Sequence, residues 1–474
     1  YGKTSITQGE LDKYRAGTER GYQTFNWKDF IVQKNSPLNS VNLNMTGGSD
    51  KINYYISATR LHQNSVLGRE FTFDRTNIQS NVDAKITDRL KLGVQINGRI
   101  EKRDQPGIPG GDDYWLPRFA ILRNRPFERP YANDNPEYLN DIKHNETNWA
   151  YNNKKLGGYW TEYWRVLQTN FSAEYQIPGV KGLSARGMYS YYIADRVMNG
   201  HEYTYKAYTY NPTDDTYTVT GGSTNPWRER GTRKVMRNVY QGQLAYSNTF
   251  GKHTVGATLV SEWQDEQVQD QWVHAVPKTN TLPLIYFPTV DTYNDSDTEL
   301  ARIGYIGRVN YDYAGKYYLE VSARRDASWK FAPDRRVGYF PSASAGWRIS
   351  EETFFKNLIG ERSILDDLKF RGSYGILGDD NILFNNDPNR PLSPYAYLPG
   401  YDYNKGNVIL SGNAVVTSRD KGQIINNISW FKSKITDIGA DFSFLGTKIT
   451  GSVDYFYRLR TGLLGRKYDI LVPS

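Results

Sequence analysis

The sequence predicts an all-β fold, an antiparallel up-and-down β-barrel of the kind that spans a membrane. Fourteen stretches alternate apolar with polar residues, and the connections between them are alternately short and long. The 474 residues include 38 Tyr, 19 Phe and 11 Trp, no Cys and only 20 Pro, and the mean hydropathy is -0.69. Membrane barrels place aromatic girdles at both interfaces and polar side chains along the lumen, so this composition fits a barrel.

The stretch 90–99 shows the alternation clearly. One parity carries Leu90, Leu92, Val94 and Ile96, and the other carries Lys91, Gln95, Asn97 and Arg99. Successive side chains of a strand point to opposite faces, so one face is apolar and the other is polar. Alternation alone does not distinguish a membrane barrel from a soluble sandwich. The lengths of the connections between the strands distinguish the two.

The predicted strands follow one another along most of the chain. They cover residues 41–45, 52–60, 73–86, 90–101, 164–177, 183–195, 235–250, 253–266, 302–313, 317–325, 338–349, 368–377, 435–445 and 448–460.

The connections fall into two classes. Those at 47–50, 87–89, 178–182, 251–252, 314–316 and 446–447 are short and have the Gly, Asp or Pro of tight turns, and 351–367 is compact and helical-looking. Four others are long, at 102–163, 196–234, 267–301 and 378–434. Short periplasmic turns on one rim and long extracellular loops on the other are typical of outer-membrane barrels.

Several other classes of protein are disfavoured. No window approaches the roughly 20 apolar residues of a membrane-spanning helix. The net charge of +8 is spread along the chain without a basic run, so nucleic acid is not a predicted partner. The first residues have neither a basic start nor an apolar stretch typical of a secretory signal. We therefore expect the chain to begin after processing or part-way through a longer polypeptide, with residues 1–40 as a lead-in to a barrel of which residues 41–474 form part.

Several runs of residues along the chain are distinctive. They are GGSDKINYY (47–55), FDRTN (73–77), RRDAS (324–328), GYFPSASAGWRIS (338–350) and LKFRGSYG (368–375), with IGADF (438–442) ahead of DYFY (454–457). These runs resemble those of the SusC-like TonB-dependent outer-membrane transporters of Bacteroidetes-type bacteria, and they occur in that family's order. Within RRDAS, Arg325 and Asp326 sit at a strand end, where paired charges would anchor a loop.

The resemblance implies a barrel of about 22 strands, of which about 14 are visible here. It implies TonB-dependent import of a bulky nutrient, an oligosaccharide first and a peptide second. The implied partners are a SusD-like lipoprotein lid, the TonB–ExbB–ExbD complex acting through the missing plug, and outer-membrane lipid and lipopolysaccharide. A dimer of transporter–lipoprotein pairs is an open alternative, as are iron-chelate or vitamin uptake and a non-transporting adhesive barrel.

Aromatic and acidic residues in two long loops are candidates for substrate binding. Aromatic faces stack on sugar rings and carboxylates accept hydrogen bonds from hydroxyls, while the alternative is that the same rings pack the loops or a lid protein. The candidates are Asp112, Asp113, Tyr114, Trp115, Trp149, Tyr159, Trp160, Asp379 and Asp380.

A weaker hypothesis concerns a metal ion. Asp291, Asp295, Asp297 and Glu299, together with Asn294, give closely spaced oxygen ligands that could hold Ca²⁺ in an extracellular loop. The alternative is a solvated acidic loop. The five His are scattered without metal or nucleophile spacing, so the sequence predicts no catalytic residue, no required cofactor and no enzyme.

Overall fold

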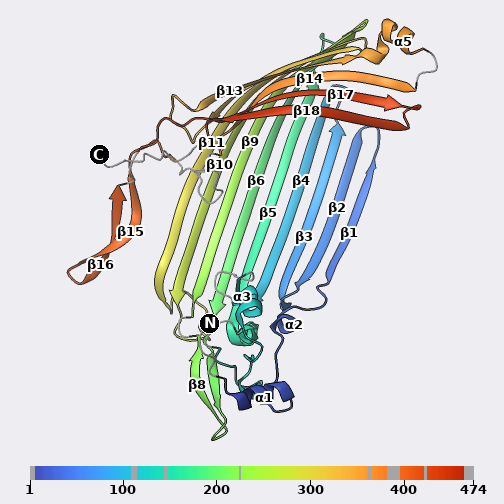
Figure 1. Ribbon diagram of the computed structural model, residues 1–474. Helices are drawn as coiled ribbons and strands as arrows, with labels where there is room; N and C mark the ends of the chain where they lie inside the picture. Colours follow the sequence, from blue (N-terminus) through green and yellow to red (C-terminus); the bar gives the residue numbers. More distant parts are fainter. Residues whose placement is uncertain are drawn as a thin grey trace, which may run out of the picture.

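One antiparallel sheet dominates the computed structural model, which describes residues 6–107, 115–142, 148–223, 226–360, 364–381, 395–420 and 424–463 (Figure 1). Its fourteen strands lie in chain order, each hydrogen-bonded to the next. They are β1 (Leu38–Gly48), β2 (Ile52–Ser65), β3 (Gly68–Lys85), β4 (Leu90–Pro106), β5 (Gly158–Gln176), β6 (Leu183–Glu202), β9 (Arg228–Phe250), β10 (His253–Val276), β11 (Thr289–Tyr313), β12 (Tyr317–Ser328), β13 (Val337–Arg348), β14 (Leu365–Asp379), β17 (Phe431–Phe444) and β18 (Ile449–Thr461). All fourteen predicted strands are confirmed.

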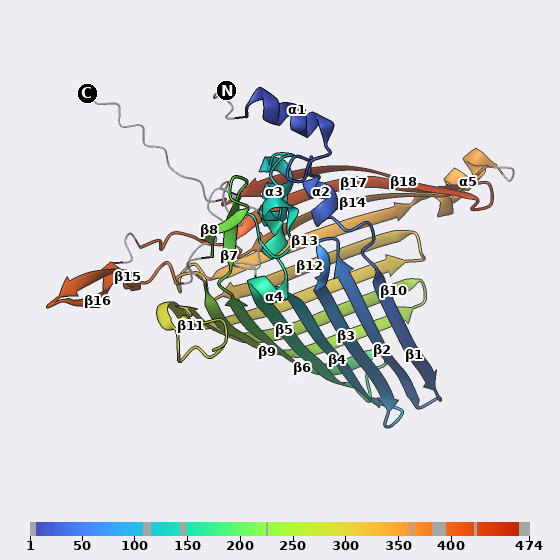
Figure 2. The ribbon, with the colours of Figure 1, turned by 90° about the horizontal axis from the view of Figure 1, so that it is seen from below.

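The sheet curves strongly. In Figure 2 it bends through β9–β11, so that β1–β6 form one limb and β12–β14 with β17 and β18 form the other. Within the described part of the chain, β1 and β18 are the two edges and do not pair with each other.

Short helices and two hairpins occupy the rims. The helix α5 (Thr353–Ile359) follows β13 on the short-turn rim, where the sequence predicted a compact helical connection. The elements at the other rim are α1 (Gln8–Ala16), α2 (Trp27–Ile31), α3 (Trp115–Arg123), α4 (Lys154–Gly157), and the hairpins β7 (Lys206–Asn211)–β8 (Thr216–Gly222) and β15 (Tyr401–Leu410)–β16 (Asn413–Asp420) (Figure 1). In the described residues, no helix combines the length and the apolar character needed to cross a membrane.

Several strands are longer than predicted at the long-loop rim. The predicted loop 267–301 was wrong in most of its length, because β10 continues to Val276 and β11 already begins at Thr289. The ladder there is held by polar pairs, such as Gln267 Nε2 with the Asp297 carboxylate at 3.2 Å. Outside the apolar band the alternation disappears while the strand pairing continues.

The two faces of the sheet differ as predicted. In β12, Tyr317, Leu319, Val321 and Ala323 lie on one face, whereas Tyr318, Glu320, Ser322 and Arg324 lie on the other. We call these the apolar face and the polar face. The apolar face has two rows of aromatic residues: Tyr311, Tyr313, Tyr317 and Trp347 near the short turns, and Tyr240, Trp263, Tyr305 and Tyr339 further along the strands on the long-loop side.

These aromatic rows bracket an aliphatic band. Along β11, Tyr305 and Tyr313 are separated by roughly 26 Å at the usual rise of a strand. The band between two aromatic girdles of a membrane barrel is about 25 Å tall. Because strands of such barrels are tilted, the match is approximate, but it assigns the apolar face to lipid and the polar face to the lumen.

A small apolar core closes the long-loop rim near the chain start. It consists of the buried residues Trp27, Ile31, Phe71, Ala120, Ile142 and Trp149. Trp27 also donates through Nε1 to the carbonyl of Glu128 at 2.9 Å. The segment before β1 therefore packs against the 102–163 connection, on the rim that carries the long loops.

Candidate functional site

The candidate site is the polar face of the sheet where the strands approach the long loops. Two hollows occur there, on opposite limbs of the sheet. We call them the Asp380 pocket and the Trp164 pocket, after a residue that lines each of them.

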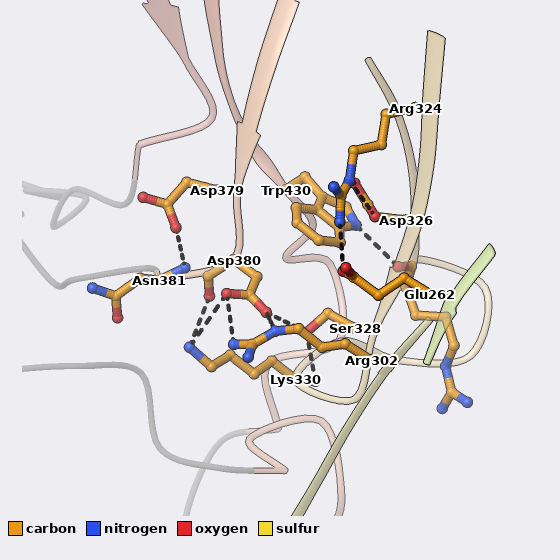
Figure 3. Close-up of polar contacts among 11 residues, drawn as sticks. Glu262, Arg302, Arg324, Asp326, Ser328, Lys330, Asp379, Asp380, Asn381 and Trp430 are labelled. Carbon is orange, nitrogen blue, oxygen red and sulfur yellow. Dashed lines mark hydrogen bonds and ion pairs between the residues drawn. The ribbon is translucent and has the colours of Figure 1, made fainter. Parts of the chain in front are cut away.

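The Asp380 pocket has a volume of about 500 Å³ and is lined by β10–β14 and the segment before β17. Arg302 holds the Asp380 carboxylate at two points, through Nε at 2.8 Å and Nη2 at 3.1 Å (Figure 3). Ser328 Oγ donates to the same carboxylate at 2.6 Å, and Lys330 Nζ donates to the Asp380 carbonyl at 3.1 Å. The buried Asp380 carboxyl group at the end of β14 therefore links β11, β12 and the segment that follows β12.

The charge of Asp380 is stable to acid. Burial alone would raise the pKa of Asp380, but the hydrogen bonds from Arg302 and Ser328 outweigh that effect and the pKa lies below its ordinary value. A carboxylate held by a two-point guanidinium contact is a strong and directional interaction. Asp380 is thus an anchor for the chain leaving β14.

A second ion-pair group lines the same pocket. Arg324 Nε contacts Asp326 Oδ2 at 2.6 Å, and its Nη2 contacts Glu262 Oε1 at 3.4 Å (Figure 3). Asp326 therefore pairs with Arg324 and not with Arg325, which corrects the expectation of a paired charge between Arg325 and its neighbour. Arg325 lies on the apolar face.

Aromatic packing closes the pocket on its loop side. Trp430 lies edge-on to Phe340 with ring centroids 5.2 Å apart, and its Nε1 donates to the Arg336 carbonyl at 2.9 Å. The Phe340 ring lies directly over Gly378, where an added Cβ would clash with it. Glycine is required at 378 because only hydrogen leaves room for that ring.

The Trp164 pocket, of about 590 Å³, lies on the opposite limb. Trp164 is partly exposed and donates through Nε1 to Glu162 Oε1 at 3.0 Å. Glu162 is also paired with Arg196 at 2.5 Å, and Glu101 with Arg75 at 2.6 Å. An accessible ring beside neutralised carboxylates therefore lines the lumen below the long loops.

Deeper in the lumen, Arg371 cross-links three strands. Its guanidinium contacts Asp454 at 2.6 Å, Asp441 at 3.2 Å and Asp437 at 3.4 Å. These carboxylates come from β17 and β18, while Arg371 comes from β14. The arrangement stabilises the wall and neutralises charge within it.

The predicted loop residues do not form one cluster. Trp149 is buried and stacks on Phe71 with centroids 5.8 Å apart, and Trp160 is buried against Met198 and Trp227. Tyr159 is half-buried against His201. The packing alternative therefore describes these three rings.

The other predicted binding residues differ in location and exposure. Trp115 is 48% exposed at the start of α3, and Asp379 is exposed and accepts a hydrogen bond from the Asn381 backbone at 2.7 Å. Asp112, Asp113 and Tyr114 lie outside the described residues. Substrate contact by Trp115 or Asp379 stays a prediction.

The acidic residues considered for Ca²⁺ lie along one strand. Asp291, Asp295, Asp297 and Glu299 all belong to β11. Asp291 contacts His274, and Asp297 accepts from Gln267 and Gln269. Across the described ranges, no group of three His, Cys, Asp or Glu is arranged to hold a metal ion. The calcium site stays a prediction.

Sequence reasoning missed Glu262, Arg302 and Arg324 as pocket residues. All three have the polar parity of their strands. The alternation of the sequence could have identified these residues as lumen-facing. It could not have shown that they share a pocket with Asp380, because Arg302 and Asp380 are 78 positions apart in the chain.

Comparison with known proteins agrees with this architecture. The chain is 25% identical to the TonB-dependent receptor P3 of Formosa agariphila over 481 residues, covering 97% of this chain and 43% of that receptor. It is 35% identical to the TonB-dependent receptor SusC of Bacteroides thetaiotaomicron over 163 residues, covering 34% of this chain and 15% of SusC. No family model matches the chain.

The fold is shared with a solved structure. The RagAB peptide transporter structure matches with a TM-score of 0.75 at 18% identity, covering 97% of this chain and 50% of that one. The chain spans less than half the length of the curated relatives P3 and SusC. These relatives are receptors and not enzymes, as predicted for this chain. The chain therefore resembles the SusC-like TonB-dependent receptors, and its sheet is part of a β-barrel of the bacterial outer membrane.

Proposed function

We propose that this chain forms part of the wall of a TonB-dependent importer that carries an oligosaccharide across the outer membrane. The observation that carries the proposal is the Trp164 pocket on the lumen face. A sugar ring stacks on an aromatic face, and its hydroxyls exchange hydrogen bonds with paired carboxylates and guanidinium groups. Trp164 and Glu162 line this hollow, and Arg196 pairs with Glu162 beside it.

The substrate experiment measures binding to the full-length transporter in mild detergent. We expect Trp164→Ala to weaken binding of the transported oligosaccharide about tenfold, because an aromatic contact is worth roughly 1.5 kcal/mol. Trp263→Ala is the matched control, since Trp263 is 59% exposed on the lipid side of β10. Equal binding by the two variants would remove the Trp164 pocket from the substrate path.

Peptide import is the second candidate. The RagAB structure with which this chain shares its fold is named a peptide transporter, and the ion pairs of the pocket also suit amide groups and peptide termini. Titrating the same two variants with peptides distinguishes the substrates. A Trp164-dependent loss confined to peptides would favour peptide import over oligosaccharide import.

We also propose that a SusD-like lipoprotein covers the long-loop rim. The hairpin β15–β16 projects from that rim (Figure 1) and exposes Val408, Ile409 and Leu410, with Ile409 at 74%. Exposed apolar groups of this kind mark protein interfaces. Ile409→Asp should therefore reduce the lipoprotein recovered with the transporter, while Val219→Asp on the hairpin β7–β8 serves as control. Full recovery with Ile409→Asp would place the partner elsewhere on the rim.

Energy for import would come from the TonB–ExbB–ExbD complex through a plug. Uptake should then stop in cells without TonB while binding to purified protein persists. Uptake of an iron chelate instead of a glycan would support the alternative iron or vitamin importer, and TonB-independent surface binding without uptake would support an adhesin. The mass of the detergent-purified assembly tests whether two transporter–lipoprotein pairs associate.

A further inference from the structure

The apolar face is not uniform, because a groove runs across it. The groove has a volume of about 1150 Å³ and crosses β5, β6 and β9–β13. Larger side chains flank it, among them Tyr175, Leu259, Tyr305 and Tyr339. Its floor consists largely of small residues, which are Ala173, Ala185, Gly187, Gly242, Gly307 and Ala323.

The groove occupies two adjacent register rows. One row links Ala173, Gly187, Gly242, Ser261, Tyr305, Arg325 and Tyr339. In the other row, Tyr175 is paired through Ala185, Leu244, Leu259, Gly307 and Ala323 to Pro341. Six inter-strand spacings make this row roughly 29 Å long. Tyr175 is next to the last residue of β5 at the short-turn rim, whereas Pro341 is close to the long-loop end of β13. The groove therefore runs obliquely from the periplasmic side of the lipid face to the extracellular side.

Arg325 lies at the extracellular end of the groove. Arg325 is paired in register with Tyr305 on one side and Tyr339 on the other. Its guanidinium carbon lies 5.7 Å from the centre of the Tyr305 ring. In the part of the chain that the structure describes, Arg325 forms no ion pair with a carboxylate.

Two other outward-facing arginines near this rim are neutralised. Arg60 contacts Asp74 at 2.7 Å, and Arg165 contacts Asp195 at 3.3 Å. An uncompensated arginine on the lipid face is unfavourable unless it reaches an anionic group. Arg325 lies at the level of the aromatic girdle, where lipid head groups begin.

We propose that Arg325 and the groove bind lipid A of the outer leaflet. A phosphate of lipid A accepts hydrogen bonds from the Arg325 guanidinium between Tyr305 and Tyr339, because the planar fork of arginine matches phosphate oxygens. One acyl chain lies along the small-residue floor, where it gains van der Waals contacts with the protein. The extracellular position of Arg325 selects the outer leaflet and hence lipid A.

The test titrates purified lipid A into the full-length transporter in detergent and counts bound lipid by native mass spectrometry. Arg325→Gln should weaken lipid A binding about tenfold, since a charge-assisted contact is lost. Arg165→Gln is the matched control, because it removes a neutralised arginine of the same rim and should leave lipid A binding unchanged. Ala323→Leu fills the groove floor without touching the cation and should also weaken binding.

The remaining measurements vary the lipid instead of the protein. Lipid A without its phosphates should bind the wild type as weakly as intact lipid A binds Arg325→Gln. Equal binding of both lipids to the wild type would overturn the proposal and leave only ordinary boundary lipid. Phosphatidylglycerol bound as tightly as lipid A would overturn the assignment to lipid A. If Arg325→Gln fails to fold, Ala323→Leu and the dephosphorylated lipid still decide the outcome.

Discussion

Replacing Asp380 by Asn should release the chain that follows β14. The asparagine keeps the shape of Asp380 but loses the charge that Arg302 contacts at 2.8 and 3.1 Å and that lies 3.7 Å from Lys330. Breaking a buried pair costs about 3–5 kcal/mol, but the Arg302 side chain is 39% exposed and water replaces part of the contact. We therefore expect a loss of about 2 kcal/mol, in the range of charge-assisted hydrogen bonds.

Hydrogen exchange measures this loss directly. A loss of about 2 kcal/mol corresponds to roughly 30-fold faster exchange of the amides in the segment 376–381. Asp379→Asn is the control, because Asp379 is exposed and accepts a hydrogen bond from the local Asn381 amide. Unchanged exchange in Asp380→Asn, or equal acceleration in both variants, would refute the anchor.

Three further predictions test the same region and the rim. The lowered pKa of Asp380 means that its stabilising contribution is present above the ordinary value of 3.8 and is lost as the pH falls through the lower folded value; exchange in this segment, corrected for intrinsic rates, should stay protected at pH 5. Trp160→Ala should lower the free energy of unfolding by about 3–5 kcal/mol, seen as a lower melting temperature, because the ring is 5% exposed. Gly378→Ala should cost about 1–3 kcal/mol through a clash with Phe340, whereas Gly372→Ala, whose Cβ would meet its nearest atom at 3.8 Å, should leave the melting temperature unchanged.

The strand pattern was readable because lipid and lumen impose opposite demands on alternate residues. In β4, Leu92 and Val94 face lipid while Gln95 and Asn97 face the lumen, as the sequence predicted. Beyond the apolar band, solvent reaches both faces of the sheet, so the residues need not alternate between apolar and polar. The outer parts of β10 and β11 were therefore not predicted, although their ladder is continuous through Trp272 paired with Asn294.

The aromatic residues of the 102–163 connection were harder to interpret. A connection of that length needs a core of its own, and Trp149 and Trp160 supply parts of it. A ring that packs a loop and a ring that stacks on a sugar have the same sequence signature. Trp164 was placed at a strand start and not considered as a binding residue, although its polar parity points it into the lumen.

The charged side chains of the lumen wall are paired with one another, and this pairing affects which substrates can bind. Arg371 is surrounded by three carboxylates, Asp380 is held by Arg302 and Lys330, and Glu162 is paired with Arg196. A charged ligand would have to break such pairs before it could be held by one partner, and each broken buried pair is costly. A neutral oligosaccharide can donate to the carboxylates and accept from the guanidinium groups while each pair stays intact. The paired charges thus favour a neutral, hydroxyl-rich substrate over an anionic chelate, and they make salt dependence a discriminating measurement: sugar binding should change little with ionic strength, whereas binding of an anion should weaken as salt is raised.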